Sequence, residues 1–420
     1  MLMRDRQVFQ EKILENGIKV FFYPDPGPGT TEFRIIIPFG TEHNTGNILH
    51  GSAHALEHMV CKRSKTYPEK RSFDCFLASE GGSCNACTNF RYTEYWAQST
   101  SDIASALWEG LFDRVFNPIF SEQDWNTEKS IIQNESKKNR FHPGQDETSK
   151  LLKTEWLKVP SPELRNIFGF GEDLNMMSID YFNHLHSETY FRLPVYILVA
   201  GQCDIEHIYQ SLSKLSTKKN NLEVIPNKAS WKNKNYQTVS NQVERFVIGW
   251  SGFMNEIDLP FEVVSNFVLN YLTNKSFGIL HHWLREEKGW LYSISSGVNA
   301  WQNKNVIWAL SLPLSDESAV NAVRKGIDEY IIRGLGDEKT LKKEVNRRIK
   351  SSVFSFQTLE KILDVAQNSL CIYGRILTEN KLQSYWRSLC TDPKYLLSFY
   401  EKHMSPQIRG ECYIIPAKAP

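Results

Sequence analysis

The order of the expected helices and strands in the first half of the chain returns in the second half, and this repeat constrains the fold more than any other feature. In the first half, a strand at 33–39 precedes helical segments and a short apolar strand at 195–200 closes the half. In the second half, a strand at 245–252 precedes helical segments and a strand at 412–415 closes the half. The halves share little identity but keep this order. The sequence therefore predicts an α+β fold of two similar domains, each a mainly antiparallel sheet packed with helices.

A segment rich in Lys and Asn separates the two halves. Residues 214–235, KLSTKKNNLEVIPNKASWKNKN, lack apolar periodicity and are typical of a linker. The chain of 420 residues then divides into an N-terminal domain at 1–213 and a C-terminal domain at 236–420. Both have an ordinary size, since domains usually contain about 50–250 residues.

The charge balance and the lack of long apolar runs exclude several functions. Lys and Arg total 49 against 48 for Asp and Glu, a net charge of +1, whereas nucleic-acid binders usually carry a basic excess. No run approaches the roughly 18 apolar residues of a membrane span, and the N-terminus fits neither a secretory signal nor a mitochondrial presequence. We therefore expect a cytoplasmic protein that binds neither nucleic acid nor membrane, with its eight cysteines reduced.

Cys84 and Cys87 form a CxxC pair, which could indicate a redox or zinc-ribbon site. The surrounding residues follow a Gly-Gly turn, are rich in Thr, Tyr and Phe, and predict a strand at 83–99. Residues three apart on a strand point to opposite faces, so the two sulfur atoms are not expected to bind one metal ion. A redox or zinc-ribbon protein stays the weaker alternative.

The sharpest chemical signal is the HALEH motif at 54–58, within an expected helix at 52–64. Positions i, i+3 and i+4 share one helix face, so the imidazoles of His54 and His58 and the carboxylate of Glu57 point the same way. In the inverted zinc motif HxxEH, two such histidines bind Zn²⁺ and the glutamate acts on a water molecule. The plain alternative is a pair of surface histidines beside an ordinary acid on an amphipathic helix.

A catalytic zinc usually has three protein ligands, so a third ligand is needed. With this motif the chain resembles the pitrilysin and insulin-degrading-enzyme superfamily, especially its short branch, which includes the mitochondrial processing peptidases. That family has a ligand glutamate 77 positions after the second histidine and another glutamate seven positions earlier, which implies Glu135 and Glu128 here. Both lie in a helix expected at 122–140, begun by the capping-box-like pair Ser121 and Asp124. Seven positions are two helical turns, so the two glutamates share one face.

Two further segments carry the resemblance. GGSCNACT resembles the family's GGxxNAxT, in which an edge strand binds the substrate backbone by β-augmentation. The residues that match this substrate-binding strand are Gly81, Gly82, Asn85, Ala86 and Thr88. LREEKGWLYSISSG resembles the family's LREKRGLAYSVSS, in which an arginine and a tyrosine complete the active site, and this implies Arg285 and Tyr292. Read alone, the segment would instead contain a helix-surface arginine and a half-buried tyrosine on a strand at 292–297.

The chain departs from the family at two places. Residues 59–64, MVCKRS, stand where the family commonly has an aromatic residue and Gly-Thr. Trp290 stands where a small or aliphatic residue is usual. Both departures could reshape the substrate pocket, so the specificity of relatives is not carried over.

The resemblance implies a zinc metalloendopeptidase with one Zn²⁺ per chain, held by His54, His58 and Glu135. Glu57 would accept a proton from the activated water and pass it to the departing amine. Glu128 would orient the ligands or the water from outside the ligand set. Arg285 and Tyr292, from the second half, would stabilise the oxyanion of the tetrahedral intermediate.

The family's architecture also implies a partner. Two such two-domain halves face one another as a clamshell around a closed chamber, and the Arg/Tyr pair reaches the zinc site of the opposite half. A chain that carries both motifs is therefore expected to form a homodimer with shared active sites, while a heterodimer with a related chain stays open.

The expected substrates are unfolded peptides that fit inside the chamber, for general turnover or for dedicated processing such as leader removal. The alternative is a non-catalytic or heterodimeric assembly subunit of the same fold, because some relatives keep the fold after losing the zinc motif. The five zinc-site residues are all present in this chain, which favours the peptidase.

Overall fold

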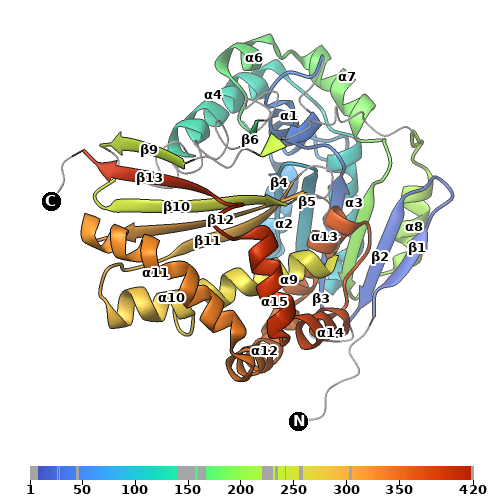
Figure 1. The fold of residues 1–420 in the computed structure, drawn as a ribbon. Coiled ribbons are helices and arrows are strands. Elements are labelled where there is room, and N and C mark those ends of the chain that lie inside the picture. The colour runs from blue at the N-terminus through green and yellow to red at the C-terminus, as the bar shows by residue number, and fades with distance from the viewer. Residues whose placement is uncertain are drawn as a thin grey trace. The chain divides into compact units, whose positions relative to one another are not determined.

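The computed structural model describes most of the chain and is drawn in Figure 1. The described residues are 8–25, 27, 29–43, 47–139, 157–158, 167–219, 230–231, 235–241, 243–254, 259–301 and 305–417. Contacts within the chain divide it into two compact units. Unit 1 takes residues 1–139, 163–225 and 355–371, and unit 2 takes residues 140–162, 226–354 and 372–420.

Unit 1 contains a six-stranded sheet in the order β1-β2-β7-β3-β5-β4. β2 and β7 are parallel and all other neighbours are antiparallel, as predicted for a mainly antiparallel sheet. β4 lies at the edge and pairs with β5 alone among the described strands. The strands are β1 (Gln10–Ile13), β2 (Lys19–Pro24), β3 (Thr30–Ile37), β4 (Ser83–Thr88), β5 (Thr93–Thr100) and β7 (Tyr196–Gly201).

The core of unit 1 lies against the face of β3 that carries Phe33, Ile35 and Ile37. Alternate residues of a strand point to the same face, so these three side chains enter one apolar cluster. Phe33 packs edge-on against Trp108 of α3, with ring centroids 5.5 Å apart. Apart from the late helix described next, the helices described in unit 1 are α1 (Ser52–Val60), α2 (Ser72–Ser79), α3 (Ala104–Phe116), α4 (Glu122–Asn139), α6 (Gly171–Met176), α7 (Ile179–Thr189) and α8 (Ile205–Ser213), with short 3₁₀ turns at Thr41–His43 and Ser101–Ile103.

The opposite face of β3 contacts α13 (Leu359–Tyr373), a helix from late in the sequence. Arg34 is only 4% exposed, and its guanidinium donates to Glu32 on its own strand at 2.7 Å. The same guanidinium binds Asp364 at 2.7 Å and Gln367 at 2.9 Å, both on α13. A single buried cation therefore fastens a late segment of the chain to the first sheet.

Unit 2 contains a five-stranded sheet in the order β11-β12-β10-β13-β9, with β13 and β9 parallel. Its strands are β9 (Asn235–Ser240), β10 (Phe246–Met254), β11 (Ser295–Trp301), β12 (Asn305–Leu314) and β13 (Gly410–Pro416), and β6 (Leu157–Lys158) pairs with β8 (Ser230–Trp231) as a separate ladder. Its helices are α9 (Leu259–Thr273), α10 (Ile279–His281), a π-helical turn (His282–Glu287), α11 (Glu317–Gly336), α12 (Glu338–Ser352), α14 (Glu379–Leu389) and α15 (Pro393–His403). A 3₁₀ turn, Val353–Phe356, follows α12.

The two sheets share one topology. Read from its parallel pair, the sheet of unit 2 runs β9-β13-β10-β12-β11, which matches β2-β7-β3-β5-β4 of unit 1 in order and in strand direction. The predicted repeat is therefore confirmed at the level of topology, and so is the predicted α+β fold class. No helix among the described residues is both long and apolar enough to cross a membrane.

Two expected strands differ from the structure. The single strand predicted at 83–99 is wrong, because β4 and β5 form a hairpin around a turn. At that turn, the side chain of Asn89 accepts hydrogen bonds from the backbone N–H groups of Arg91 and Tyr92, at 3.1 and 3.2 Å, which stabilises the reversal. β11 begins at Ser295, so Tyr292 precedes the strand on which it was predicted. Most of the predicted linker at 214–235 lies outside the described residues.

We predict that Arg34→Met lowers the free energy of unfolding by about 3–5 kcal/mol, because it leaves Glu32 and Glu94 buried without their shared cation. Urea unfolding followed by circular dichroism measures this change. Lys342→Met, which removes the exposed ion pair with Glu338, should change it by less than about 0.5 kcal/mol. Equal unfolding midpoints for the two variants would contradict the prediction.

Candidate metal centre

The start of α1 is fixed by a close backbone contact. Gly51 precedes the helix with a φ of 82°, a conformation that favours glycine. A Cβ at this position would lie 2.6 Å from the backbone nitrogen of Gly169. From this start, Leu56 packs into the core of unit 1, while His54 and His58 lie on the face toward α4.

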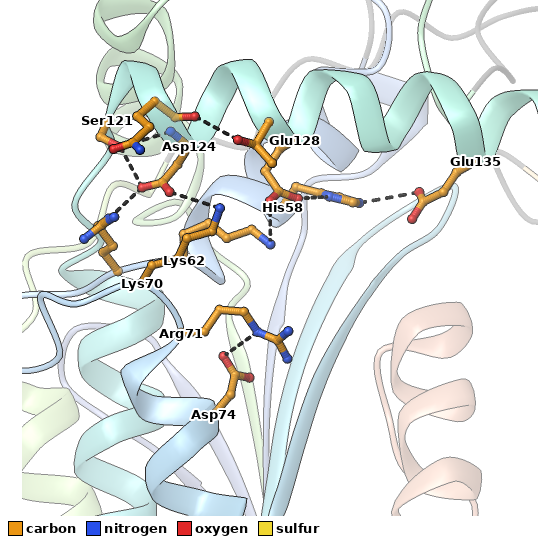
Figure 2. A network of polar contacts seen from close by, with 12 residues as sticks. His58, Lys62, Lys70, Arg71, Asp74, Ser121, Asp124, Glu128 and Glu135 are labelled. Carbon is orange, nitrogen blue, oxygen red and sulfur yellow. Dashed lines mark hydrogen bonds and ion pairs between the residues drawn. The ribbon is translucent and has the colours of Figure 1, made fainter.

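Three side chains from α1 and α4 converge on one point. The Nε2 atoms of His54 and His58 are 3.3 Å apart. The Oε2 atom of Glu135 lies 3.7 Å from the first nitrogen and 3.6 Å from the second. Figure 2 shows His58 and Glu135 pointing toward one another from the two helices. Among the described residues, these form the one group of three or more donors able to hold a metal ion.

The donor set fits zinc. Bonds of 2.0–2.1 Å in a tetrahedron place neighbouring donor atoms about 3.3–3.4 Å apart, which is close to the spacing of these three atoms. Burial lowers the pKa of His54 to about 3, with a smaller effect from His58, so its imidazole is neutral near pH 7. Two imidazoles and one carboxylate are a usual ligand set for catalytic zinc.

Glu128 fixes the ring of His58 through Nδ1, the ring nitrogen that does not face the other two donors. Its Oε2 atom lies 3.0 Å from Nδ1 of His58, and its Oε1 atom lies 3.0 Å from the ammonium of Lys62. Burial by itself raises the pKa of Glu128, but the hydrogen bonds from His58 and Lys62 outweigh burial and the net pKa is lowered. An ionised Glu128 accepts the Nδ1–H of His58, which leaves the lone pair on Nε2 facing the other donors.

Glu57 is buried beside the three donors. The hydroxyl of Thr88 donates to its Oε2 atom at 2.6 Å, and the Thr88 hydroxyl also lies 3.2 Å from that of Thr93. Burial raises the pKa of Glu57, and the hydrogen bond from Thr88 partly opposes this. The carboxylate is thus held in one orientation and biased toward accepting a proton.

Thr88 was predicted as part of the substrate-binding strand, and its contact with Glu57 was not foreseen. Lys62 was missed as well, because it lies in the turn after α1, where the helical period no longer places side chains. The ligand and catalytic roles of the named residues remain predictions that this geometry supports.

β4 presents the other residues of the predicted substrate-binding strand. Asn85 and Cys87 are exposed, whereas Cys84 and Ala86 are half-buried against the core. Cys84 and Cys87 therefore point to opposite faces, as predicted, and no disulfide forms. A Cβ at Gly82 would lie 2.8 Å from the backbone oxygen of Gln98, which explains a glycine at the start of the edge strand.

Arg285 and Tyr292 form a pair within unit 2. The guanidinium carbon of Arg285 lies 4.7 Å from the ring centroid of Tyr292, within the range of a cation–π contact. Tyr292 is 70% exposed and precedes β11, so the alternative of a half-buried tyrosine on a strand is wrong. Trp290, one of the two departures, packs edge-on against Trp283 with centroids 6.2 Å apart.

Two protein-family models match the chain. Residues 24–159 match the model described as Insulinase (Peptidase family M16), and residues 178–350 match the model described as Peptidase M16 inactive domain. Together the matched ranges include the whole HALEH motif, both α4 glutamates and the Arg/Tyr pair.

Curated relatives are distant and longer than the matched part. Protease 3 of Escherichia coli (strain K12) is 27% identical over 141 residues, 34% of this chain and 15% of the relative. Two proteins described as uncharacterized zinc proteases, one from Rickettsia felis and YmfH from Bacillus subtilis, are 25% and 27% identical over 210 and 223 residues, in each case 50% of both chains. The matched part thus spans half or less of these relatives.

Solved structures share the fold. A protease from Helicobacter pylori superposes with a TM-score of 0.82 at 15% identity, covering 98% of this chain and 100% of its own. Pitrilysin superposes with a TM-score of 0.70 at 19% identity, covering 99% of this chain and 45% of its own. The same fold therefore occurs as a whole chain and as part of a longer one.

We predict that the purified chain binds about one zinc ion and that His58→Ala binds none after dialysis, because a three-ligand site loses one donor. Atomic emission measures the zinc content. His184→Ala, which changes an exposed histidine on α7, is the matched control and should keep the metal. Equal zinc content in His58→Ala and the unaltered chain would contradict the assignment.

Proposed function

The chain belongs to the insulinase family, peptidase family M16, and from this premise we propose that it is a zinc-dependent endopeptidase acting on unfolded peptides. The observation that carries the proposal is the convergence of His54, His58 and Glu135 beside the buried Glu57. When bound, zinc would supply the Lewis acidity that activates water near neutral pH. Side chains of this protein would transfer the proton and stabilise the charge that develops on the substrate.

Glu57 is the proposed proton carrier. Its carboxylate takes a proton from the attacking water and passes it to the nitrogen of the departing amine, a role worth about 10²- to 10⁴-fold in rate. The hydrogen bond from Thr88 keeps this carboxylate in one orientation during both transfers. Glu128 keeps Nε2 of His58 directed at the other donors.

Arg285 and Tyr292 are the proposed donors to the negative charge that develops on the substrate carbonyl oxygen. Their mutual contact, with the tyrosine largely exposed, suits a pair that meets a ligand. The edge of β4 that does not pair with β5 would bind the peptide backbone as an added strand, at the level of Asn85 and Ala86.

We further propose that two copies associate and enclose the substrate, with Arg285 and Tyr292 of one copy acting at the zinc site of the other. The support is that this fold spans 45% of the pitrilysin chain and 48% of the periplasmic protease PqqL from Escherichia coli, so one chain of this kind corresponds to about half of those proteins. A related chain as the second half is the alternative. Product mapping by mass spectrometry distinguishes general peptide turnover from removal of a leader.

We predict that Glu57→Gln keeps zinc but lowers kcat on a fluorogenic peptide by about 10²- to 10⁴-fold, because the amide cannot take the proton. Glu172→Gln, an exposed acid on α6, should leave kcat unchanged. A chelator should abolish the activity of the unaltered chain, and added zinc should restore it. Unchanged turnover in zinc-loaded Glu57→Gln would overturn the role of Glu57, and a zinc-loaded unaltered chain without activity would favour the assembly subunit.

We predict that mixing Glu57→Gln with Tyr292→Phe restores activity, to about one quarter of the unaltered level if subunits exchange at random. Half of the dimers would then be mixed, and each mixed dimer would hold one intact site and one doubly defective site. Native mass spectrometry shows whether mixed dimers form. Mixed dimers without recovered activity would contradict sharing, and mixing Glu57→Gln with Glu57→Ala is the control that should recover nothing.

A further inference from the structure

Two carboxylates one turn apart on α4 are buried against basic side chains that follow the HALEH motif. Asp124 and Glu128 are 1% and 2% exposed. Nε of Arg63 lies 2.6 Å from Asp124, and Nζ of Lys62 lies 3.0 Å from Glu128. Both cations belong to the segment that directly follows α1.

The two ion pairs differ in the other residues that their carboxylates contact. Among the described residues, the remaining polar contacts of Asp124 are Ser121, which starts the same helix, and Lys70 at 3.4 Å. The other oxygen of Glu128 instead meets Nδ1 of His58 at 3.0 Å. Figure 2 shows both branches, and only the branch through Glu128 continues to a donor of the metal centre.

The ammonium of Lys62 determines which oxygen of Glu128 is available. It occupies Oε1 from the side of the α1 terminus, and this leaves Oε2 to accept the Nδ1–H of His58. A buried carboxylate that lost its cation would keep a large desolvation cost and would reorient toward any remaining donor or water. The ring of His58 would then lose its fixed partner, and its Nε2 would no longer be held toward His54 and Glu135.

We propose that Lys62 is a positioning residue for His58, acting through Glu128, and that it raises the affinity of the chain for zinc. The proposal rests on the zinc site proposed above. Partners behind a metal-binding histidine typically contribute 10- to 100-fold to metal affinity. Lys62 does not contact His58 directly but through Glu128, and it is the sole cation paired with Glu128 among the described residues.

The test measures the zinc dissociation constant of the full chain by competition with a chromophoric chelator. Lys62→Met keeps the length of the side chain without its charge, and we expect affinity to fall by about 10- to 100-fold. Lys62→Arg keeps the charge and should keep most of the affinity. If the methionine variant does not fold, as judged by circular dichroism, Lys62→Gln takes its place.

Arg63→Met is the matched control. It removes the neighbouring ion pair to α4 and should lower the unfolding midpoint, yet leave zinc affinity close to that of the unaltered chain, because Asp124 does not touch a donor. If Arg63→Met weakens zinc binding as much as Lys62→Met does, the effect comes from helix docking in general and the proposal fails.

A double variant tests whether Lys62 acts on zinc binding through Glu128. In a Glu128→Gln background, Lys62→Met should cause no further loss of zinc affinity, since the residue through which Lys62 acts is already changed. A full additional loss in that background would overturn the proposal. An unaltered chain that binds no zinc would overturn the proposed function instead, whereas zinc binding that is equal in the unaltered chain and in Lys62→Met would overturn only the role of Lys62.

Discussion

The docking of α4 against α1 is the contact on which the candidate metal centre depends. Two histidines four positions apart on one helix supply two donors by themselves, but Glu135 lies far along the chain and joins them only because α4 packs in one register. Trp125 sets this register from the core, where its indole N–H donates to the backbone oxygen of Met177 at 3.0 Å. Glu128 holds α4 from the other side, through its ion pair with Lys62. A slip of one residue would rotate Glu135 by about 100° around the helix axis and remove the third donor.

Buried charge plays the same part on both faces of the first sheet. Arg34 fastens α13 to one face of β3, and Lys62, through Glu128, fastens α4 near the other. Such pairs add little net stability compared with apolar packing, because removing the charges from water offsets most of their attraction. Breaking one partner is costly, however, so each pair excludes other positions of its helix. Unit 1 therefore combines an apolar core, which stabilises the fold, with buried ion pairs that select one arrangement of the segments around the site.

The sequence predicted what depends on local spacing. The HALEH motif on one helix face and the opposite faces of Cys84 and Cys87 follow from the periods of a helix and a strand, and the start of α4 follows from the cap at Ser121. The repeat of strand order was readable because each half buries its own sheet. Contacts between distant segments were not readable. Arg34 with α13 and Thr88 with Glu57 join residues whose neighbours in sequence give no sign of the partner. The hairpin of β4 and β5 was missed because both strands have strand-like composition, and the turn is marked only by Asn89.

The two histidines of the candidate metal centre are held by different interactions, one by a hydrogen bond and the other by packing. His58 is fixed by a directional hydrogen bond that continues to Lys62, so its orientation depends on charge. His54 has a buried Nδ1 that makes no hydrogen bond with any residue the structure describes, and its ring packs edge-on against Phe168 with centroids 5.3 Å apart. Packing limits the ring's rotation without determining which nitrogen carries the hydrogen, whereas the bond to Glu128 determines both for His58. The protein itself therefore fixes both the orientation and the tautomer of His58, whereas for His54 it restricts only the orientation.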